Sequence, residues 1–152
     1  MKEDFIVQDF NIPPHPKGVV LNGKTVRLEP LNVENHSEDL FESNSLDVEG
    51  KNWAYLPYGP FDTLKSYQTW LGKEASKQDP TFFSIVRKFD DKAVGVASFL
   101  RINQTDGSIE VGHINYSPLI QRTREGTEAM FLMMEWAFEN GYRRYEWKCN
   151  AL

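Results

Sequence analysis

The sequence has 152 residues, 40% of them hydrophobic and 26% charged, and a net charge of −5 at pH 7. This length and composition are typical of one compact domain and exclude an intrinsically disordered chain. No apolar segment approaches the ~20 residues that span a bilayer, so we expect no membrane partner. The acidic balance also disfavours a nucleic-acid partner, because such proteins usually present clustered Lys and Arg.

The amino terminus and the single cysteine indicate a reducing compartment. Residues 1–5 include two acidic side chains where a signal peptide has a basic region. Cys149 has no second cysteine with which to form an internal disulfide. We therefore expect a cytoplasmic protein.

The first half of the chain predicts an arm, a strand and two helices. Residues 1–23 are expected to form an extended N-terminal arm, since Pro13, Pro14 and Pro16 lack amide donors, and residues 24–152 a single domain. Alternation from residue 25 to 30 predicts a half-buried strand. Asn32 is the expected cap of a first helix, and Asp62 that of a second, which stops before residues 79–80.

The second half predicts three strands, a helix and a final strand. The strands span residues 82–88, 93–103 and 108–116, and Asp106-Gly107 between the last two is a hairpin signal. The helix that follows is apolar on two sides and is expected to be mostly buried, and Asn140-Gly141 ends it. Residues 145–149 alternate as a last strand, which the handedness of β-α-β units places parallel to strand 108–116. The fold class is α+β, with a mixed, mostly antiparallel sheet.

The turn before the long helix is a candidate anion site. Free backbone N–H groups and the positive end of the helix dipole collect there. Arg122 and Arg124 could add guanidinium groups that bind phosphate oxygens. The alternative is that both are solvated, or that they pair with Glu125 and Glu128.

Several short segments of the sequence together resemble those of one family. They are Glu110-Val111-Gly112-His113, Asn115-Tyr116-Ser117-Pro118 and Gln121 to Ala129, supported by Leu28-Glu29-Pro30-Leu31, Gly59-Pro60-Phe61 and Gly141-Tyr142-Arg143-Arg144. The chain resembles the GNAT superfamily of N-acetyltransferases, and within it the branch that includes ribosomal-protein-alanine N-acetyltransferases and many small-molecule acetyltransferases. The resemblance implies an acyl-CoA N-acyltransferase fold, acetyl-CoA as cosubstrate and an amine acceptor, either a small molecule or a peptide N-terminus.

The resemblance also implies which residues hold the cosubstrate. Backbone groups of Ile114, Asn115 and Tyr116 would pair with the pantetheine arm. The pyrophosphate would lie on the turn formed by Gln121, Arg122, Thr123, Arg124, Glu125, Gly126 and Thr127. Family members usually carry glycines where Arg122 and Arg124 stand, and glycine allows a close approach of backbone to phosphate.

Glu110 matches the family position that often supplies the catalytic base, which removes a proton from the amine. The alternative is a structural ion pair with Arg101 across the hairpin. Even spacing places Tyr116 on the same strand face as Glu110. In a regular strand His113 would lie on the opposite face, unless a bulge shifts the alternation of side chains. We expect it to be a hydrogen-bonded core histidine.

Other candidate residues favour structural roles. His15, His36 and Cys149 show no metal-ligand spacing, so no metal is expected. Cys149 is expected to be a small buried hydrophobe rather than a nucleophile. The aromatic residues of segment 51–61 either form the wall of an acceptor pocket or cover the sheet.

The family continues beyond the last strand, so the resemblance implies a C-terminally incomplete domain and assigns no general acid. The last strand would have an unpaired edge, which we expect to form a homodimer or exchange strands. The leading hypothesis is an N-acetyltransferase. The alternatives are a domain that binds CoA or another phosphorylated ligand without turnover, as a partner of another chain, and a purely structural domain.

Overall fold

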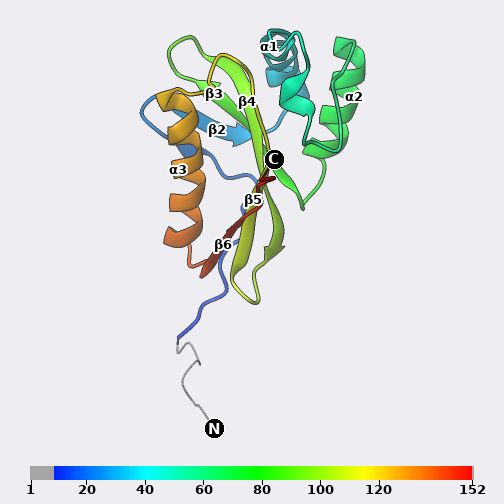
Figure 1. The fold of residues 1–152 in the computed structure, drawn as a ribbon. Helices are drawn as coiled ribbons and strands as arrows, with labels where there is room; N and C mark the ends of the chain where they lie inside the picture. Colours follow the sequence, from blue (N-terminus) through cyan, green and yellow to red (C-terminus); the bar gives the residue numbers. More distant parts are fainter. Residues whose placement is uncertain (1–8, 152) are drawn as a thin grey trace.

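A computed structural model describes residues 9–151 and contains a six-stranded sheet with helices on both faces (Figure 1). The strands lie side by side in chain order. They are β1 (Leu21–Asn22), β2 (Val26–Pro30), β3 (Thr81–Arg87), β4 (Lys92–Asn103), β5 (Ser108–Tyr116) and β6 (Arg144–Trp147). Neighbours are antiparallel except β5 and β6, which are parallel, as predicted for the β-α-β unit.

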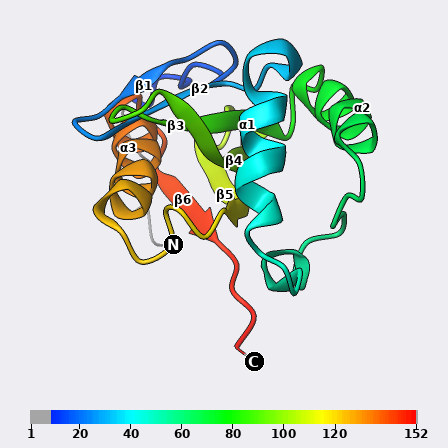
Figure 2. The ribbon, with the colours of Figure 1, turned by 90° about the horizontal axis from the view of Figure 1, so that it is seen from above.

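The helices divide between the two faces of the sheet (Figure 2). They are α1 (Val33–Ser45), α2 (Leu64–Ala75) and α3 (Arg124–Glu139), and a short 3-10 helix, η1 (Lys51–Trp53), lies between α1 and α2. One hydrophobic core joins α3 to the sheet around Phe83, Phe99 and Met133. A second core joins α1 and α2 to the opposite face around Leu40 and Phe82. The α+β class predicted from the sequence is confirmed.

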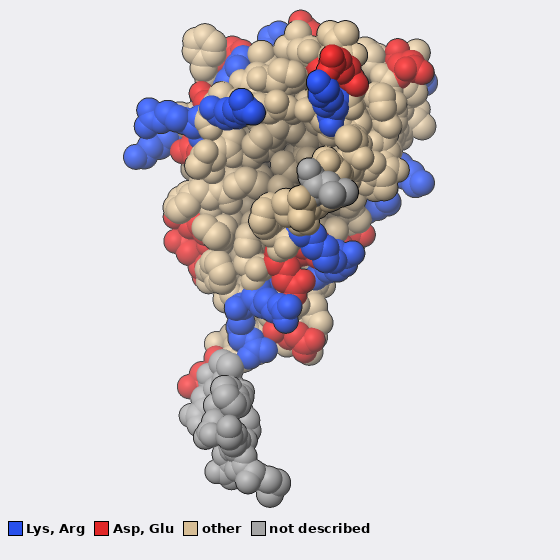
Figure 3. All heavy atoms as spheres, viewed as in Figure 1, with Lys and Arg blue, Asp and Glu red and all other residues tan. Residues whose placement is uncertain are grey.

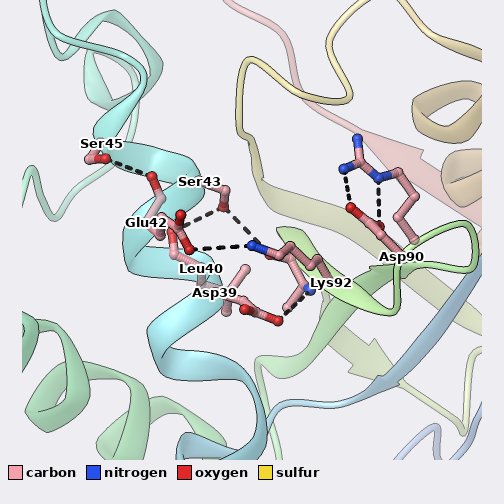
Figure 4. A network of polar contacts seen from close by, with 9 residues as sticks. Asp39, Leu40, Glu42, Ser43, Ser45, Asp90 and Lys92 are labelled. Atoms are coloured by element: carbon pink, nitrogen blue, oxygen red, sulfur yellow. Dashed lines mark hydrogen bonds and ion pairs between the residues drawn. The ribbon is translucent and has the colours of Figure 1, made fainter.

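Polar contacts fix α1 to the adjacent strand (Figure 4). The Asp39 carboxylate accepts a hydrogen bond from the Ala93 backbone nitrogen at 3.2 Å, and Lys92 reaches Glu42 at 3.5 Å. Asn32 caps the helix as predicted, since its side chain accepts from Asn35 N at 2.9 Å. These contacts hold α1 across the start of β4.

Two expected boundaries differ in the structure. The N-cap of α2 is Thr63 rather than Asp62, because the Thr63 hydroxyl accepts from the backbone nitrogen of Ser66 at 3.1 Å. The final strand ends at Trp147, so Cys149 lies beyond it and is exposed rather than buried.

The expected N-terminal arm is attached to the domain. Its residues 1–8 lie outside the described part of the chain, and residues 9–20 contain no helix or strand. The Tyr142 hydroxyl donates to Pro14 O at 2.9 Å, and the Arg143 guanidinium lies 4.6 Å from the Phe10 ring centre. Leu21 and Asn22 then join the sheet as β1, because Leu21 is buried opposite Leu28.

The long helix α3 is buried on one side only, which corrects the expectation that it is mostly buried. Ala129, Met133 and Ala137 are fully buried against the sheet. On another side Phe131 and Phe138 remain about half exposed, at 50% and 52%. No described helix has the length and apolar character needed to cross a membrane.

A β-bulge in β5 changes which side chains share a face. Val96 pairs with Asn115 and Ser98 with Gly112, so β5 has one more residue than β4 between these pairs. His113 absorbs the extra residue with a φ of +50°, a conformation that His adopts more readily than most residues. Beyond the bulge, the alternation of side chains is therefore reversed.

Candidate functional site

An apolar groove opens where β5 and β6 part. Their ladder ends at the pair Val111 and Trp147, whereas β5 continues to Tyr116. The groove has a volume of about 690 Å³ and lies between β5, β6 and α3. Its lining includes Val111, Ile114, Tyr116, Met130, Met134 and Tyr145. Figure 3 shows a hollow of uncharged atoms in this region, with Lys and Arg side chains gathered to its upper left, on the side where α3 begins.

The groove leads to the first turn of α3. The Thr123 hydroxyl caps this helix by accepting from Gly126 N at 3.3 Å and donates to Ile120 O at 2.8 Å. The N–H groups of Arg124 and Glu125 have no acceptor within the helix, as in any first turn. Thr127 lines the groove one turn along the helix. This is the backbone arrangement that stabilises an anion.

Two residues give the turn its shape. Arg122 has a φ of +58°, the left-handed conformation that glycine adopts most easily, so the chain turns here without a glycine. Gly126 is tightly surrounded, because a Cβ atom there would lie 2.6 Å from Ile120 O and 2.9 Å from the Tyr116 ring. The Tyr116 hydroxyl also donates to Gly126 O at 2.5 Å and fixes β5 to α3.

Neither arginine of the turn is neutralised by the pairing considered in the sequence analysis. Among the described residues, Arg122 and Arg124 form no ion pair with Glu125 or Glu128. Both line a second cavity of about 690 Å³ that also includes Lys24 and shares Thr127 with the groove. Three cationic side chains thus lie around the beginning of α3, in a cavity whose lining also includes Glu128.

Glu128 is engaged with the β1–β2 turn instead. It accepts from the backbone nitrogens of Lys24, Thr25 and Val26 and from the Thr25 hydroxyl, at distances from 2.5 to 3.1 Å. Burial opposes the charge on Glu128, but the hydrogen bonds from Thr25 and the backbone lower its pKa to about 2. This carboxylate therefore attaches α3 to the other edge of the sheet.

A side-chain amide network that the sequence analysis missed closes one end of β5. The carbonyl oxygen of Tyr116 accepts from Asn52 Nδ2 at 3.0 Å and from Gln121 Nε2 at 2.9 Å. Gln121 Nε2 also lies 2.7 Å from Asn52 Oδ1. Gln121 is therefore turned toward η1, and only the tertiary structure reveals Asn52, because it lies 64 residues from Tyr116 in the chain.

Glu110 lies on the opposite face of β5 from the groove. Its side chain is almost fully buried, and Oε2 lies 2.6 Å from Arg101 Nη1 and 3.5 Å from Lys148 Nζ. The ion pair with Arg101, considered as the alternative, is thus present. Tyr116 does not share the face of Glu110 as expected, because the bulge turns Tyr116 toward α3.

His113 lies on the face that the aromatic residues of α2 and its preceding loop cover. The bulge thus overturns the placement expected for a regular strand. His113 Nδ1 lies 3.2 Å from the Tyr58 hydroxyl, and the His113 ring also packs against Phe82. Burial lowers the pKa of His113, which favours the neutral ring.

The remaining candidates have structural surroundings. Trp53, Tyr58 and Phe61 pack with Trp70 over the sheet, while Tyr55 is 70% exposed. The Asn115 side chain is buried, and neither polar atom of its amide has a hydrogen-bond partner in the described structure. Within residues 9–151, no group of three or more His, Cys, Asp or Glu side chains is arranged to hold a metal ion.

Comparison with known proteins identifies the family. Residues 45–151 match the family described as "Acetyltransferase (GNAT) family". The chain belongs to this family. Two solved GNAT structures are also similar over nearly all of the chain: a GCN5-related N-acetyltransferase from Brucella melitensis (37% identity, TM-score 0.90) and a probable GNAT-family acetyltransferase from Chromobacterium violaceum (34% identity, TM-score 0.88).

The alignments cover nearly all of this chain but a smaller share of each solved protein. The alignment covers 95% of this chain and 66% of the Brucella protein, and 99% of this chain and 75% of the Chromobacterium protein. The microcin C7 self-immunity acetyltransferase MccE, solved with acetyl-CoA and AMP, shares the fold at 15% identity and a TM-score of 0.65, over 85% of this chain and 72% of its own. No curated protein sequence gave a significant match.

Proposed function

We propose that this GNAT-family chain is an N-acetyltransferase that moves an acetyl group from acetyl-CoA to a primary amine of a peptide or small molecule. The observation that carries the proposal is the apolar groove between β5, β6 and α3, which leads to the first turn of α3, where Lys24, Arg122 and Arg124 line the adjoining cavity. An apolar channel that ends at a helix N-terminus beside arginine side chains fits a ligand with a long thin arm and a pyrophosphate.

The residues present fit acetyl-CoA. The stretch of β5 that is not paired with β6 includes Ile114, Asn115 and Tyr116, and its backbone groups would hold the pantetheine arm. The Tyr116 carbonyl already accepts from two donors. The turn from Gln121 to Thr127 would hold the pyrophosphate on the amides of Arg124 and Glu125 and on the arginine side chains. The left-handed backbone of Arg122 supports this reading, because it supplies the turn that family glycines usually form.

Glu110 is the proposed base. Bound acetyl-CoA supplies a thioester whose carbonyl carbon is open to attack by an amine. Glu110 would accept the proton that the amine loses as its nitrogen–carbon bond forms and the carbon–sulfur bond breaks, directly or through a water molecule. Arg101 and Lys148 keep the carboxylate in one place for this step.

The remaining partners and the location are also proposals. The free edge of β6, with Trp147 63% exposed, would pair with a second copy of the chain. Sedimentation at high micromolar concentration should then show a dimer, and a monomer would contradict this pairing. We propose the cytoplasm as its site of action and assign it neither a membrane nor a nucleic-acid partner, and cell fractionation tests this location.

Calorimetric titration with CoA and acetyl-CoA, followed by a thiol-release assay with a panel of amines, tests the function. Binding with amine-dependent thiol release would support the transferase. Binding without release for any amine would favour the alternative, a CoA-binding domain that acts as a partner of another chain. Absence of binding would overturn both.

A further inference from the structure

A separate cavity lies between the C-terminal end of α1, the loop that follows it and α2. Figure 2 shows this loop leaving the lower end of α1 and rising to α2. The cavity has a volume of about 310 Å³ and shares no lining residue with the groove or the α3 cavity. Its size is at the lower end of small-molecule sites, which range from about 300 to 1,000 Å³. A small ligand would therefore fill it.

Aromatic rings form much of the wall. Phe41, Trp53, Phe61 and Tyr67 all line the cavity. They also pack on one another: Trp53 and Phe61 lie 5.7 Å apart, Phe61 and Tyr67 5.3 Å, and Phe41 and Tyr67 6.1 Å between ring centres. The faces of aromatic rings carry partial negative charge, so rings that turn their faces to a cavity attract cations.

Groups with negative or partial negative charge also lie at the cavity. Asp47 lines it and forms no ion pair among the described residues, and its Oδ2 accepts from Asn52 N at 2.8 Å. Asn44, also in the lining, has a buried side-chain oxygen without a hydrogen-bond partner in the described structure. The last turn of α1 carries the negative end of the helix dipole and contains no basic residue. No Lys, Arg or His is among the described residues of the lining.

From the aromatic wall, the Asp47 carboxylate and the helix C-terminus, we infer that this cavity binds a small organic ammonium ion with apolar substituents. A hard metal ion would require about six or more oxygen ligands, which a wall of rings does not supply. An alkylammonium ion matches both features, because its substituents contact the rings and its charge faces Asp47.

Occupancy would also act on η1. Trp53 forms one wall of the cavity, and the adjacent Asn52 donates both to Asp47 through its backbone and to Tyr116 O through its side chain. A bound cation would therefore stabilise the segment that holds the end of β5. The inference itself requires no acetyl transfer, so it can be tested without CoA.

Choline and its neutral carbon isostere, in which a carbon atom replaces the nitrogen, form the sharpest pair of probes. Calorimetry measures their affinities, and the indole N–H signal of Trp53, assigned by its loss in Trp53→Phe, reports binding at this cavity. We expect saturable choline binding at least about tenfold tighter than that of the isostere, with a shift of the Trp53 signal. Equal affinities, or no shift of that signal at choline saturation, would overturn the inference.

Comparing Asp47→Asn with Glu49→Gln distinguishes the effect of the cavity carboxylate from that of any nearby negative charge. Asn at position 47 keeps an oxygen that can accept from Asn52 N, whereas Glu49 pairs with Lys51 and does not line the cavity. We expect Asp47→Asn to weaken choline binding about tenfold and Glu49→Gln to change it less than about twofold. The same affinity in the two variants would contradict the proposed site, whatever the outcome of the acetyl-transfer assays.

Discussion

The Glu128 carboxylate lies 2.7 Å from the backbone nitrogen of Thr25, which precedes it by 103 residues. This contact joins the start of α3 to the turn between β1 and β2. It also sets one wall of the cavity that Lys24, Arg122 and Arg124 surround. The position of the proposed phosphate site thus depends on a carboxylate that touches no phosphate itself.

We expect Glu128→Gln to lower the free energy of unfolding by about 1–3 kcal/mol, because a neutral amide replaces a carboxylate with four donors. The folded pKa of about 2 lies below the ordinary value of 4.5, so the unfolded state binds more protons between them. This stabilisation is complete above about pH 4.5 and is lost as the pH falls toward 2. Urea unfolding from pH 6 to pH 3 measures it.

Glu135→Gln is the matched control, since Glu135 is exposed on the same helix. It should leave the unfolding free energy within about 0.5 kcal/mol of the original. If both variants have the same acid dependence, the assignment of this effect to Glu128 is wrong.

Gly126→Ala should displace the start of α3. The new Cβ would lie 2.6 Å from Ile120 O, which is backbone and cannot move aside alone. We expect a loss of about 1–3 kcal/mol in unfolding free energy and weaker CoA binding. Gly72→Ala in α2 is the control, because its Cβ would meet only Val33 at 3.6 Å, and it should stabilise the helix by about 0.5–1 kcal/mol. Thermal melts of the two variants shifting in the same direction would contradict this account.

Replacing both Arg122 and Arg124 by Gln should weaken CoA binding about tenfold or more at low salt, because two guanidinium groups near the phosphates are lost. The difference should shrink as ionic strength rises. Lys65→Ala removes one exposed charge from α2 and should leave the affinity unchanged. Calorimetry at two salt concentrations makes the measurement, and an unchanged affinity in the double variant would mean that the arginines are ordinary surface charges.

Glu110→Gln should reduce kcat about 100-fold or more while leaving CoA affinity nearly constant, because the amide cannot accept the proton. The ion pair with Arg101 complicates this test, since Glu110→Gln breaks this pair as well as removing the proposed proton acceptor. Arg101→Gln breaks the same pair and keeps the carboxylate, so it serves as the control. A similar loss of kcat in both variants would assign Glu110 to structure rather than proton transfer.

His36 should make folding sensitive to mild acid. It is buried, and its Nδ1 accepts from Asn32 N at 3.1 Å, which requires a neutral ring. Burial lowers its pKa below the ordinary value of 6.5, so the unfolded state binds more protons as the pH falls and stability decreases below about pH 6.5. His36→Asn keeps an acceptor and should flatten the unfolding free energy between pH 7 and pH 5. An unchanged slope would show that other groups dominate.

The sequence predicted every long element and the parallel pairing of β5 with β6, because alternation, helical spacing and turn residues are local signals. Asn32 and Asp106-Gly107 belong to this class. The side-chain faces of β5 could not be predicted in the same way. One inserted residue at His113 reverses them, and the bulge is defined only by the register against β4.

In the candidate site, too, local features could be predicted from the sequence and long-range contacts could not. The segment from Gln121 to Thr127 could be predicted as a candidate anion site because it is contiguous and leads into a helix. The contacts of Asn52 with Tyr116 and of Glu128 with Thr25 were missed, since each joins distant segments through a single side chain. The exposure of Phe131 was also missed, because an apolar helix side does not reveal from sequence whether anything covers it.

Because of the bulge, side chains alternate between the two faces of β5 in opposite order before and after His113. Val111 and Ile114 both line the groove although they are three residues apart, an odd separation that a regular strand would place on opposite faces. In a regular strand Asn115 would share the α3 face with Val111, and Tyr116 would lie on the face of Glu110. The inserted residue thus brings Ile114 and Tyr116 to the groove side of the strand, opposite Glu110.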